Sequence, residues 1–359
     1  MALENKTYVP TLAIRASEMN GLEFLPKATK DRMTPCVLLA PWANSLSLGK
    51  AIERVERAFR HQNYFLDIDR DYEFTNVESP PQKELVELLN PKNAFENWCQ
   101  FVTEHERIWP CIQTQGQNES NIRTQIERFQ SAGRAYCLRI FMHRAPSNIA
   151  AVISAFAASG AADYAIILEG GWTIDPLSLA GQFDGTIGGL LQSIDATIPI
   201  VLSCTSIPKM FTEFDGGITT VRFTNRELVE QIKQRRSNRS RVIYGDWGST
   251  RPRDPAGFAS RPLDRVDYPT RSAWDIARNK TDEWDFKKNA QAIVGSPHWD
   301  GNLGIWGEEQ ILNTTISPAL GIDTPQKNVA SRVNIHLHRQ AFYDTGNFGG
   351  LNLDEDWED

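Results

Sequence analysis

Short apolar runs alternate with longer amphipathic stretches along most of the chain. The apolar runs predict strands at 8–14, 35–40, 64–68, 108–114, 135–142, 164–168, 198–204 and 242–245. Most of these runs are continuously apolar, which is typical of parallel strands that helices cover on the outside. Because eight such strands alternate with helical patterns, we predict an α/β fold, a TIM-like (β/α) barrel of eight units.

The stretches between the strands carry helical periodicity. In 48–59, Ile52, Val55 and Phe59 recur at offsets of three and four and so share one face. Further helices are expected at 15–33, 83–89, 94–105, 121–132, 148–158 and 226–235.

The composition and the pattern of apolar residues change after Gly248. Residues 249–275 are rich in Pro, Arg and Asp and predict a long ordered loop, and 296–306 predict a structured loop. Helical patterns return at 287–294 and 329–343. We therefore expect a barrel over 1–250, a loop-rich and helical C-terminal extension over 251–345 that packs on it, and a disordered acidic tail over 346–359.

Composition limits the class of protein. The 359 residues exceed a minimal barrel of roughly 250. A net charge of −7 argues against non-specific coating of nucleic acid, although a local basic groove stays open. The sequence has no apolar run long enough to span a membrane and no signal-peptide pattern at 1–10. None of its five cysteines forms a CxxC pair, so we expect buried, reduced thiols in a cytoplasmic protein.

Acidic residues gather where several strands end, which is where barrels place functional side chains. Asp67 and Asp69 follow strand three, and being two positions apart they point to one side. With Glu169 and Asp246 they predict a carboxylate ring that suits general acid/base catalysis or a divalent cation. The other interpretation is structural, with these carboxylates held in ion pairs to Arg15 and Arg139 inside the barrel. The remaining polar residues near these strand ends are Asp71, His143, Gly170, Gly171, Thr205, Ser206 and Trp247.

Arg139 lies inside the apolar run 135–142, so its charge must be paired or face a polar cavity. Its planar guanidinium suits a carboxylate or a phosphate. We therefore expect either a pair with Asp67 or an anionic, phosphorylated ligand. Gly170–Gly171 and Thr205–Ser206 offer amide and hydroxyl donors to such a phosphate.

Two charged segments suggest partners. Arginines cluster around the eighth strand, where they form either a solvated surface or a contact to a phosphate-rich partner such as nucleic acid. They are Arg235, Arg236, Arg239, Arg241, Arg251 and Arg253. The acidic tail around Trp357 predicts either a solubilising segment or a contact to a protein partner. His336 and His338 fall on opposite faces if 329–343 is helical, which excludes one metal shared by both.

Several short motifs resemble the phage-associated beta protein family. They are Tyr8-Val9-Pro10, Thr34-Pro35, Leu66-Asp67, Arg139, Ser206-Ile207-Pro208, Tyr244-Gly245-Asp246-Trp247-Gly248, Trp274 with Arg278, Ile305-Trp306-Gly307-Glu308 and Asn334-Ile335-His336. The chain departs from the family pattern at Leu38 or Leu39, where an acidic residue is frequent, at Ile305 and Glu308, and around Leu168–Glu169. The resemblance implies a barrel and a phage or phage-defence context. It implies no established activity.

Two hypotheses of function follow. In the first, the protein hydrolyses a phosphorylated substrate such as a nucleotide or nucleic acid. The four acidic residues act as catalytic groups or ligands of a cation, and a further set binds the substrate: Arg15, Arg139, Ser206, Trp247, Trp274, Arg278, Trp306 and His336. In the second, the barrel is a non-catalytic module that senses an anionic ligand or binds a protein partner. An open cavity around the carboxylates favours the enzyme, and closure by arginines favours the module.

Overall fold

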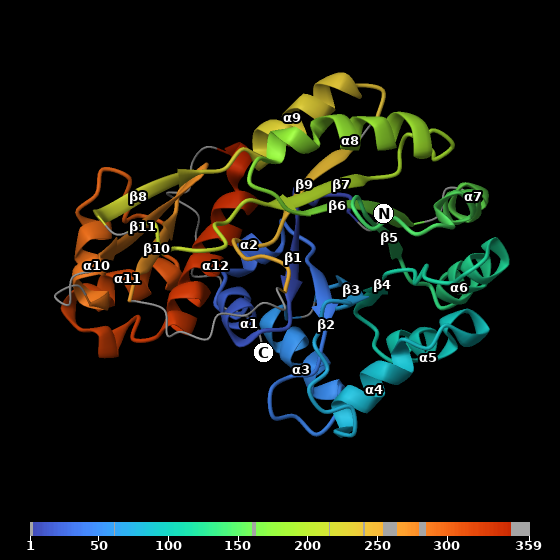
Figure 1. Ribbon diagram of the computed structural model, residues 1–359, viewed down its shortest axis with the longest axis horizontal. Helices are drawn as coiled ribbons and strands as arrows, with labels where there is room; N and C mark the ends of the chain where they lie inside the picture. Colours follow the sequence, from blue (N-terminus) through green and yellow to red (C-terminus); the bar gives the residue numbers. More distant parts are fainter. Residues whose placement is uncertain are drawn as a thin grey trace.

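The computed structural model describes residues 3–60, 62–159, 163–214, 216–239, 241–253, 264–279 and 285–345. Eight parallel strands curl into a nearly closed barrel with helices around it, which confirms the predicted α/β barrel (Figure 1). Their order around the barrel is β4-β3-β2-β1-β9-β7-β6-β5. The strands are β1 (Tyr8–Ala13), β2 (Cys36–Leu39), β3 (Tyr64–Ile68), β4 (Ile108–Pro110), β5 (Tyr136–Phe141), β6 (Tyr164–Trp172), β7 (Ile200–Thr205) and β9 (Val242–Asp246).

The barrel closes between β4 and β5 through one parallel bridge, Cys111 to Cys137. The amide of Ile112 donates to the carbonyl oxygen of Cys137 (2.9 Å), and the two Sγ atoms lie 2.8 Å apart. All five cysteines are buried free thiols, as the sequence predicts.

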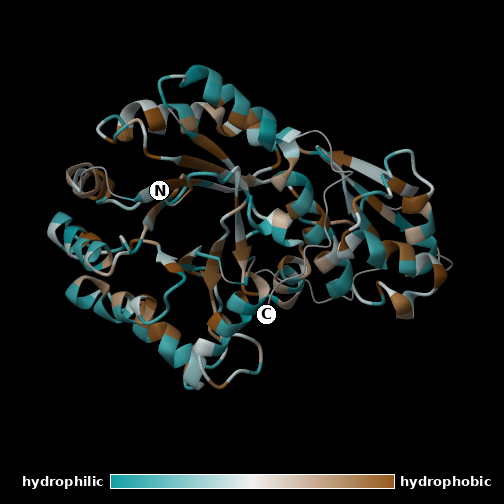
Figure 2. Cartoon of the chain, turned by 180° about the vertical axis from the view of Figure 1, so that it is seen from behind, coloured by the Kyte–Doolittle hydropathy of each residue, from teal (hydrophilic) through white to brown (hydrophobic). Residues whose placement is uncertain are grey.

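The strands separate two apolar layers. Val9, Phe65, Ile167, Val201 and Ile243 fill the barrel interior, and alternate strand residues pack outward against the helices. Apolar residues accordingly line the strands, while polar residues cover the helix surfaces (Figure 2).

The surrounding helices largely match the predicted ones. They are α1 (Ala16–Glu23), α2 (Lys27–Lys30), α3 (Gly49–Ala58), α4 (Pro80–Leu88), α5 (Lys92–Thr103), α6 (Glu119–Ser131), α7 (Ile149–Ala158), α8 (Ala180–Gly185) and α9 (Asn225–Arg235). The sequence analysis missed α8, because glycines at 181 and 185 weaken its helical signal. No helix within the described ranges is both long and apolar enough to cross a membrane.

The remaining elements build a second layer beside the barrel (Figure 1). A three-stranded antiparallel sheet has the order β10-β11-β8. Its strands are β8 (Gly216–Arg222), β10 (Val266–Pro269) and β11 (Ala273–Asn279). The helices of this layer are α10 (Phe286–Val294), α11 (Trp306–Ile316) and α12 (Pro325–Ala341). The predicted loop over 249–275 is therefore wrong in part, because β10 and the start of β11 lie in it. Pairing decides these strands, because β10 pairs with β11 and β11 pairs with β8.

Two contacts join the barrel to the extension. β8 leaves the barrel after β7 and pairs with β11 of the extension. Helix α12 packs along α1, and its Val333, Leu337 and Ala341 belong to the main core. The acidic tail over 346–359 lies outside the described residues.

Candidate functional site

A buried ion network occupies the barrel interior below its mouth. Arg139 of β5 donates from Nη1 to Asp67 of β3 (3.3 Å) and from Nη2 to Glu169 of β6 (3.0 Å). Only 2% of the Arg139 side chain is exposed, so this charge depends on its partners. Burial disfavours the guanidinium, but the neighbouring carboxylates raise the pKa of Arg139 above its ordinary value. The structural pairing weighed for Arg139 is therefore present.

Glu169 has no free lone pair for chemistry. The surrounding donors are Arg139 (3.0 Å), Ser203 (3.2 Å) and Thr11 (3.5 Å) to Oε2, and Trp247 Nε1 (2.9 Å) and the Gly171 amide (2.8 Å) to Oε1. A carboxylate with donors on both oxygens is held in one orientation. Glu169 and Trp247 thus belong to the network that fixes Arg139, and the amide of Gly171 serves Glu169.

Asp67 and Asp69 line one cavity, as their spacing predicts, but arginines cover both. Asp67 accepts from Arg139 and from Gln113 Nε2 (2.9 Å). Asp69 accepts from Arg253 Nε (2.6 Å). Arg15 instead pairs with Glu18 (3.1 Å), so the expected pairing of Arg15 with the strand-end carboxylates is wrong.

Asp246 does not join this ring. In β9, Ile243 faces the barrel interior and Tyr244 the outer layer, so Asp246 faces outward with Tyr244. Four donors surround its carboxylate: the Tyr8 hydroxyl, the Tyr244 hydroxyl (2.7 Å), His336 Nε2 of α12 (2.6 Å) and the Gly248 amide (2.8 Å). Burial would raise the pKa of Asp246, but His336 and the two tyrosines lower it. A ring of four carboxylates is therefore not formed.

The aromatic and hydroxyl residues predicted to bind substrate are dispersed. The ring of Trp274 packs at a tilt against Phe223, with 4.5 Å between the ring centres, and its Nε1 donates to Ser249 (2.8 Å). A void of about 10 Å3 lies beside them, and Asp246 and His336 also line it. Such a void has room for about one water molecule.

The other predicted binding residues lie apart from the carboxylates of the barrel mouth. Ser206 donates to Asn225 (3.5 Å), Trp306 stacks on Phe24 (4.8 Å), and Arg278 of β11 donates to the carbonyl oxygen of Phe214 (3.5 Å). The sequence analysis therefore combined residues that belong to separate places in the fold.

The two neighbouring histidines of α12 point to different groups. His336 reaches Asp246, whereas His338 Nδ1 lies 2.8 Å from Thr29 Oγ1. Within the described residues no group of three or more His, Cys, Asp or Glu side chains is arranged to hold a metal ion. The described aspartates at the barrel mouth form ion pairs with arginines instead.

A cavity of about 530 Å3 opens at the carboxyl ends of β3, β4 and β5. Asp67, Asp69 and Arg139 form its floor, and residues outside the predicted site form its wall. The wall includes Arg70, Gln113, Gln115, Arg144 and Asn148. Arg70 and Arg144 lie a few residues past the ends of β3 and β5, so the strand-end rule would have found them if it had been applied to cations as well as to acids.

Arg70 is the least compensated cation of this wall. Its guanidinium donates to the amide oxygens of Gln115 (2.6 Å) and Gln113 (2.6 Å), and among the described residues it makes no salt bridge. Arg144 forms a two-pronged pair with Asp71 (2.8 and 3.0 Å), and Phe141 lies under both Arg139 (4.4 Å) and Arg144 (4.9 Å). The wall therefore presents positive charge on a planar aromatic support.

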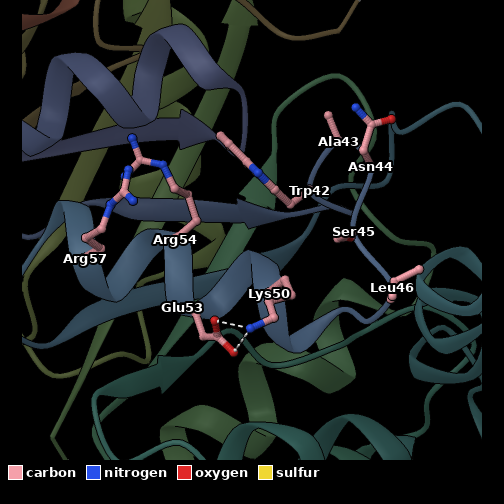
Figure 3. Close-up of a pocket in the computed structure, with 9 residues that line it drawn as sticks. All are labelled: Trp42, Ala43, Asn44, Ser45, Leu46, Lys50, Glu53, Arg54 and Arg57. Carbon is pink, nitrogen blue, oxygen red and sulfur yellow. Dashed lines mark hydrogen bonds and ion pairs between the residues drawn. The ribbon is translucent and has the colours of Figure 1, made fainter.

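A second hollow of about 480 Å3 lies beside the loop that follows β2 (Figure 3). Its cations are paired locally: Lys50 with Glu53 (2.7 Å), and Arg54 (2.8 Å) and Arg57 (3.1 Å) with Glu23. Each cation of this hollow therefore has an acidic partner.

The predicted arginine cluster around β9 is largely used within the fold. Arg236 pairs with Asp184 (2.7 Å), Arg239 donates to main-chain oxygens, and Arg253 pairs with Asp69. Arg251 donates to the carbonyl oxygens of Pro208 and Lys209. Most of these arginines are therefore held by contacts within the fold, which neither the solvated surface nor the phosphate-rich partner had predicted.

Fold and site together define an α/β barrel protein with an internal ion network and a cationic mouth. The chain belongs to the Beta protein family, whose sequence profile matches residues 8–342, from the start of β1 to just past α12. It is similar to Protein beta of Enterobacteria phage P4, with 25% identity over 349 residues, 94% of this chain and 93% of that protein. The predicted resemblance is confirmed, and it covers barrel and extension alike.

Proposed function

We propose that the protein is a ligand-binding barrel whose mouth takes up a small molecule with a phosphate or carboxylate group. The observation that carries this proposal is Arg70, a cation on the wall of a 530 Å3 cavity that donates to two neutral amides and, among the described residues, makes no salt bridge. An arginine fork binds such planar or tetrahedral anions through two hydrogen bonds. The amide nitrogen of Gln115, whose oxygen accepts from Arg70, offers a further donor on the same wall.

The strand-end carboxylates already accept hydrogen bonds or ion pairs from protein groups, which supports ligand binding over hydrolysis. A general base or a cation ligand needs an available lone pair. Glu169 and Asp246 each accept several hydrogen bonds, and Arg253 holds Asp69. A divalent cation at the mouth would have to displace arginines from Asp67 and Asp69.

Titration calorimetry with phenyl phosphate tests the proposal. Arg70→Ala is expected to weaken binding roughly tenfold or more, since a hydrogen bond to a charged group contributes about 1.5–3 kcal/mol. Lys50→Ala, which removes an exposed cation outside the mouth, serves as the control and should bind as the unmodified protein does. Equal affinity in the Arg70 variant, or no binding to the unmodified protein, would refute the proposal.

Hydrolysis of a phosphorylated substrate, such as a nucleotide or nucleic acid, is the second candidate. One observation favours it: Asp67 and Asp69 both border the cavity that Arg70 lines. In this case Asp67 is the base, and Asp67→Asn should abolish turnover of a phosphate ester at temperatures where circular dichroism shows the variant still folded, since Arg139 keeps its partner Glu169. A variant that keeps its turnover would remove Asp67 from catalysis.

A further inference from the structure

A second cavity of the same size adjoins the first at the barrel mouth. It also measures about 530 Å3 and shares Phe141 and Arg144 with the first cavity. Its lining also includes His143, Lys209 and Arg253. The two cavities therefore adjoin at Phe141 and Arg144.

Lys209 gives this second cavity a cation without an acidic partner. Its Nζ lies 4.2 Å from the ring centre of Trp172, and among the described residues it makes no salt bridge. An aromatic face compensates a cation only in part, by roughly 0.5–1 kcal/mol at an exposed site. The exposed His143 packs beside Gly171, where an added Cβ would lie 3.2 Å from the imidazole. Glycine at 171 therefore leaves that ring its place on the cavity wall.

Arg144 and Asp71 meet where the two cavities join. Their two-pronged pair is partly exposed, with 46% and 26% of the side chains accessible. Exposed pairs of this kind contribute only about 0–1 kcal/mol, so an incoming anion can replace Asp71 at low cost. The Asp71 carboxylate then marks the position where Arg144 holds an acidic group.

From this arrangement we infer that the ligand carries two anionic groups and spans both cavities. This inference rests on the proposed function. One group binds at Arg70, the other at Lys209, and Arg144 turns from Asp71 to the ligand between them. The ligand class is a small bisphosphorylated molecule, or one with a phosphate and a carboxylate at opposite ends. Two tethered groups gain affinity because the second binds at a high effective concentration.

Calorimetry with a series of α,ω-alkane bisphosphonates of two to eight methylenes tests the inference, with the corresponding alkyl monophosphonates as references. One length is expected to bind roughly tenfold or more tighter than its monophosphonate. Lys209→Ala should abolish this gain, so that the variant binds each bisphosphonate no more than about twofold tighter than its monophosphonate. Asp71→Asn should strengthen bisphosphonate binding, because it removes the group that competes for Arg144.

The outcomes separate this inference from the proposed function. A bisphosphonate has two equivalent ends, so it gains a factor of about two in affinity even when only one end binds. If monophosphonates bind through Arg70 but no bisphosphonate exceeds this factor, the ligand does not span both cavities. The proposed function then still stands. A gain that survives in Lys209→Ala also overturns the inference. If neither class of probe binds the unmodified protein, both proposals fail.

Discussion

Single buried polar residues carry much of the specificity of this fold. Arg139 joins β3, β5 and β6 through two carboxylates, and Asp246 joins β1, β9 and α12 through two hydroxyls and an imidazole. Each buried charge is costly without its partners. These side chains therefore fix how the elements meet, whatever ligand the mouth takes.

His338 makes stability depend on pH. Burial, and then the nearby charge of Arg339, lower the pKa of His338 from 6.5 to about 3. The unfolded chain takes up this proton near pH 6.5, whereas the folded chain resists it until about pH 3. The free energy of unfolding therefore falls as pH drops through this window, by up to about 1.4 kcal/mol per pH unit from this group.

Replacing His338 tests that dependence. In His338→Gln, urea unfolding between pH 6 and pH 4 should show a shallower loss of stability than in the unmodified protein. His143→Gln, at an exposed histidine, is the control and should keep the original slope. Equal slopes in the His338 variant would show that this imidazole does not contribute to the acid response.

At the scale of elements, α12 is the central connection. It packs against α1, and Asn334 donates to the carbonyl oxygen of Gly21 (2.9 Å). Arg332 pairs with Asp267 of β10 (2.5 Å), while His336 reaches the barrel. One helix therefore contacts the barrel and the antiparallel sheet at the same time.

Because α1 and α12 approach closely at Gly21, we expect a larger side chain there to destabilise the protein. A Cβ there would lie 2.7 Å from the carbonyl oxygen of Ala330 and 2.8 Å from Val333 Cβ. Gly21→Ala should lower the free energy of unfolding by about 1–3 kcal/mol, the usual cost of overpacking. Gly181→Ala in α8 is the matched control, because a Cβ there meets nothing within 4 Å. Urea unfolding should show no loss at Gly181, and a gain of up to about 1 kcal/mol is expected from helix propensity.

At the scale of the whole molecule, the extension has a cluster of its own but also shares part of the main core with the barrel. Leu337 and Phe342 pack with Tyr8 and Leu12 in the main cluster, and β8 crosses from the barrel into the extension sheet. The chain should therefore unfold in a single calorimetric transition. Two separate transitions would show that barrel and extension are independently stable.

A shortened chain tests the same point. The fragment 1–250 lacks α12, so it should lose cooperative unfolding and bind hydrophobic dyes. The chain 1–345 keeps every described residue and is the control, which should unfold as the full chain does. A cooperative 1–250 fragment would contradict a shared core.

The sequence by itself determined the barrel and a large part of its mouth. Continuous apolar runs separated by amphipathic helices are a local property, and they placed eight strands and the polar residues at their ends. Asp67, Arg139 and Glu169 were identified in this way, and the structure brings them together.

Tertiary structure alone decided the partners of these residues and the form of the extension. The direction in which Asp246 points depends on β9 packing under α12, a contact between residues 90 positions apart. The strands β8, β10 and β11 are held by pairing with one another, and β8 is far from its partner β11 in the sequence, so local patterns did not reveal this sheet. The cationic mouth likewise arises because separate loops converge at one end of the barrel, and distance along the chain carries no record of that convergence.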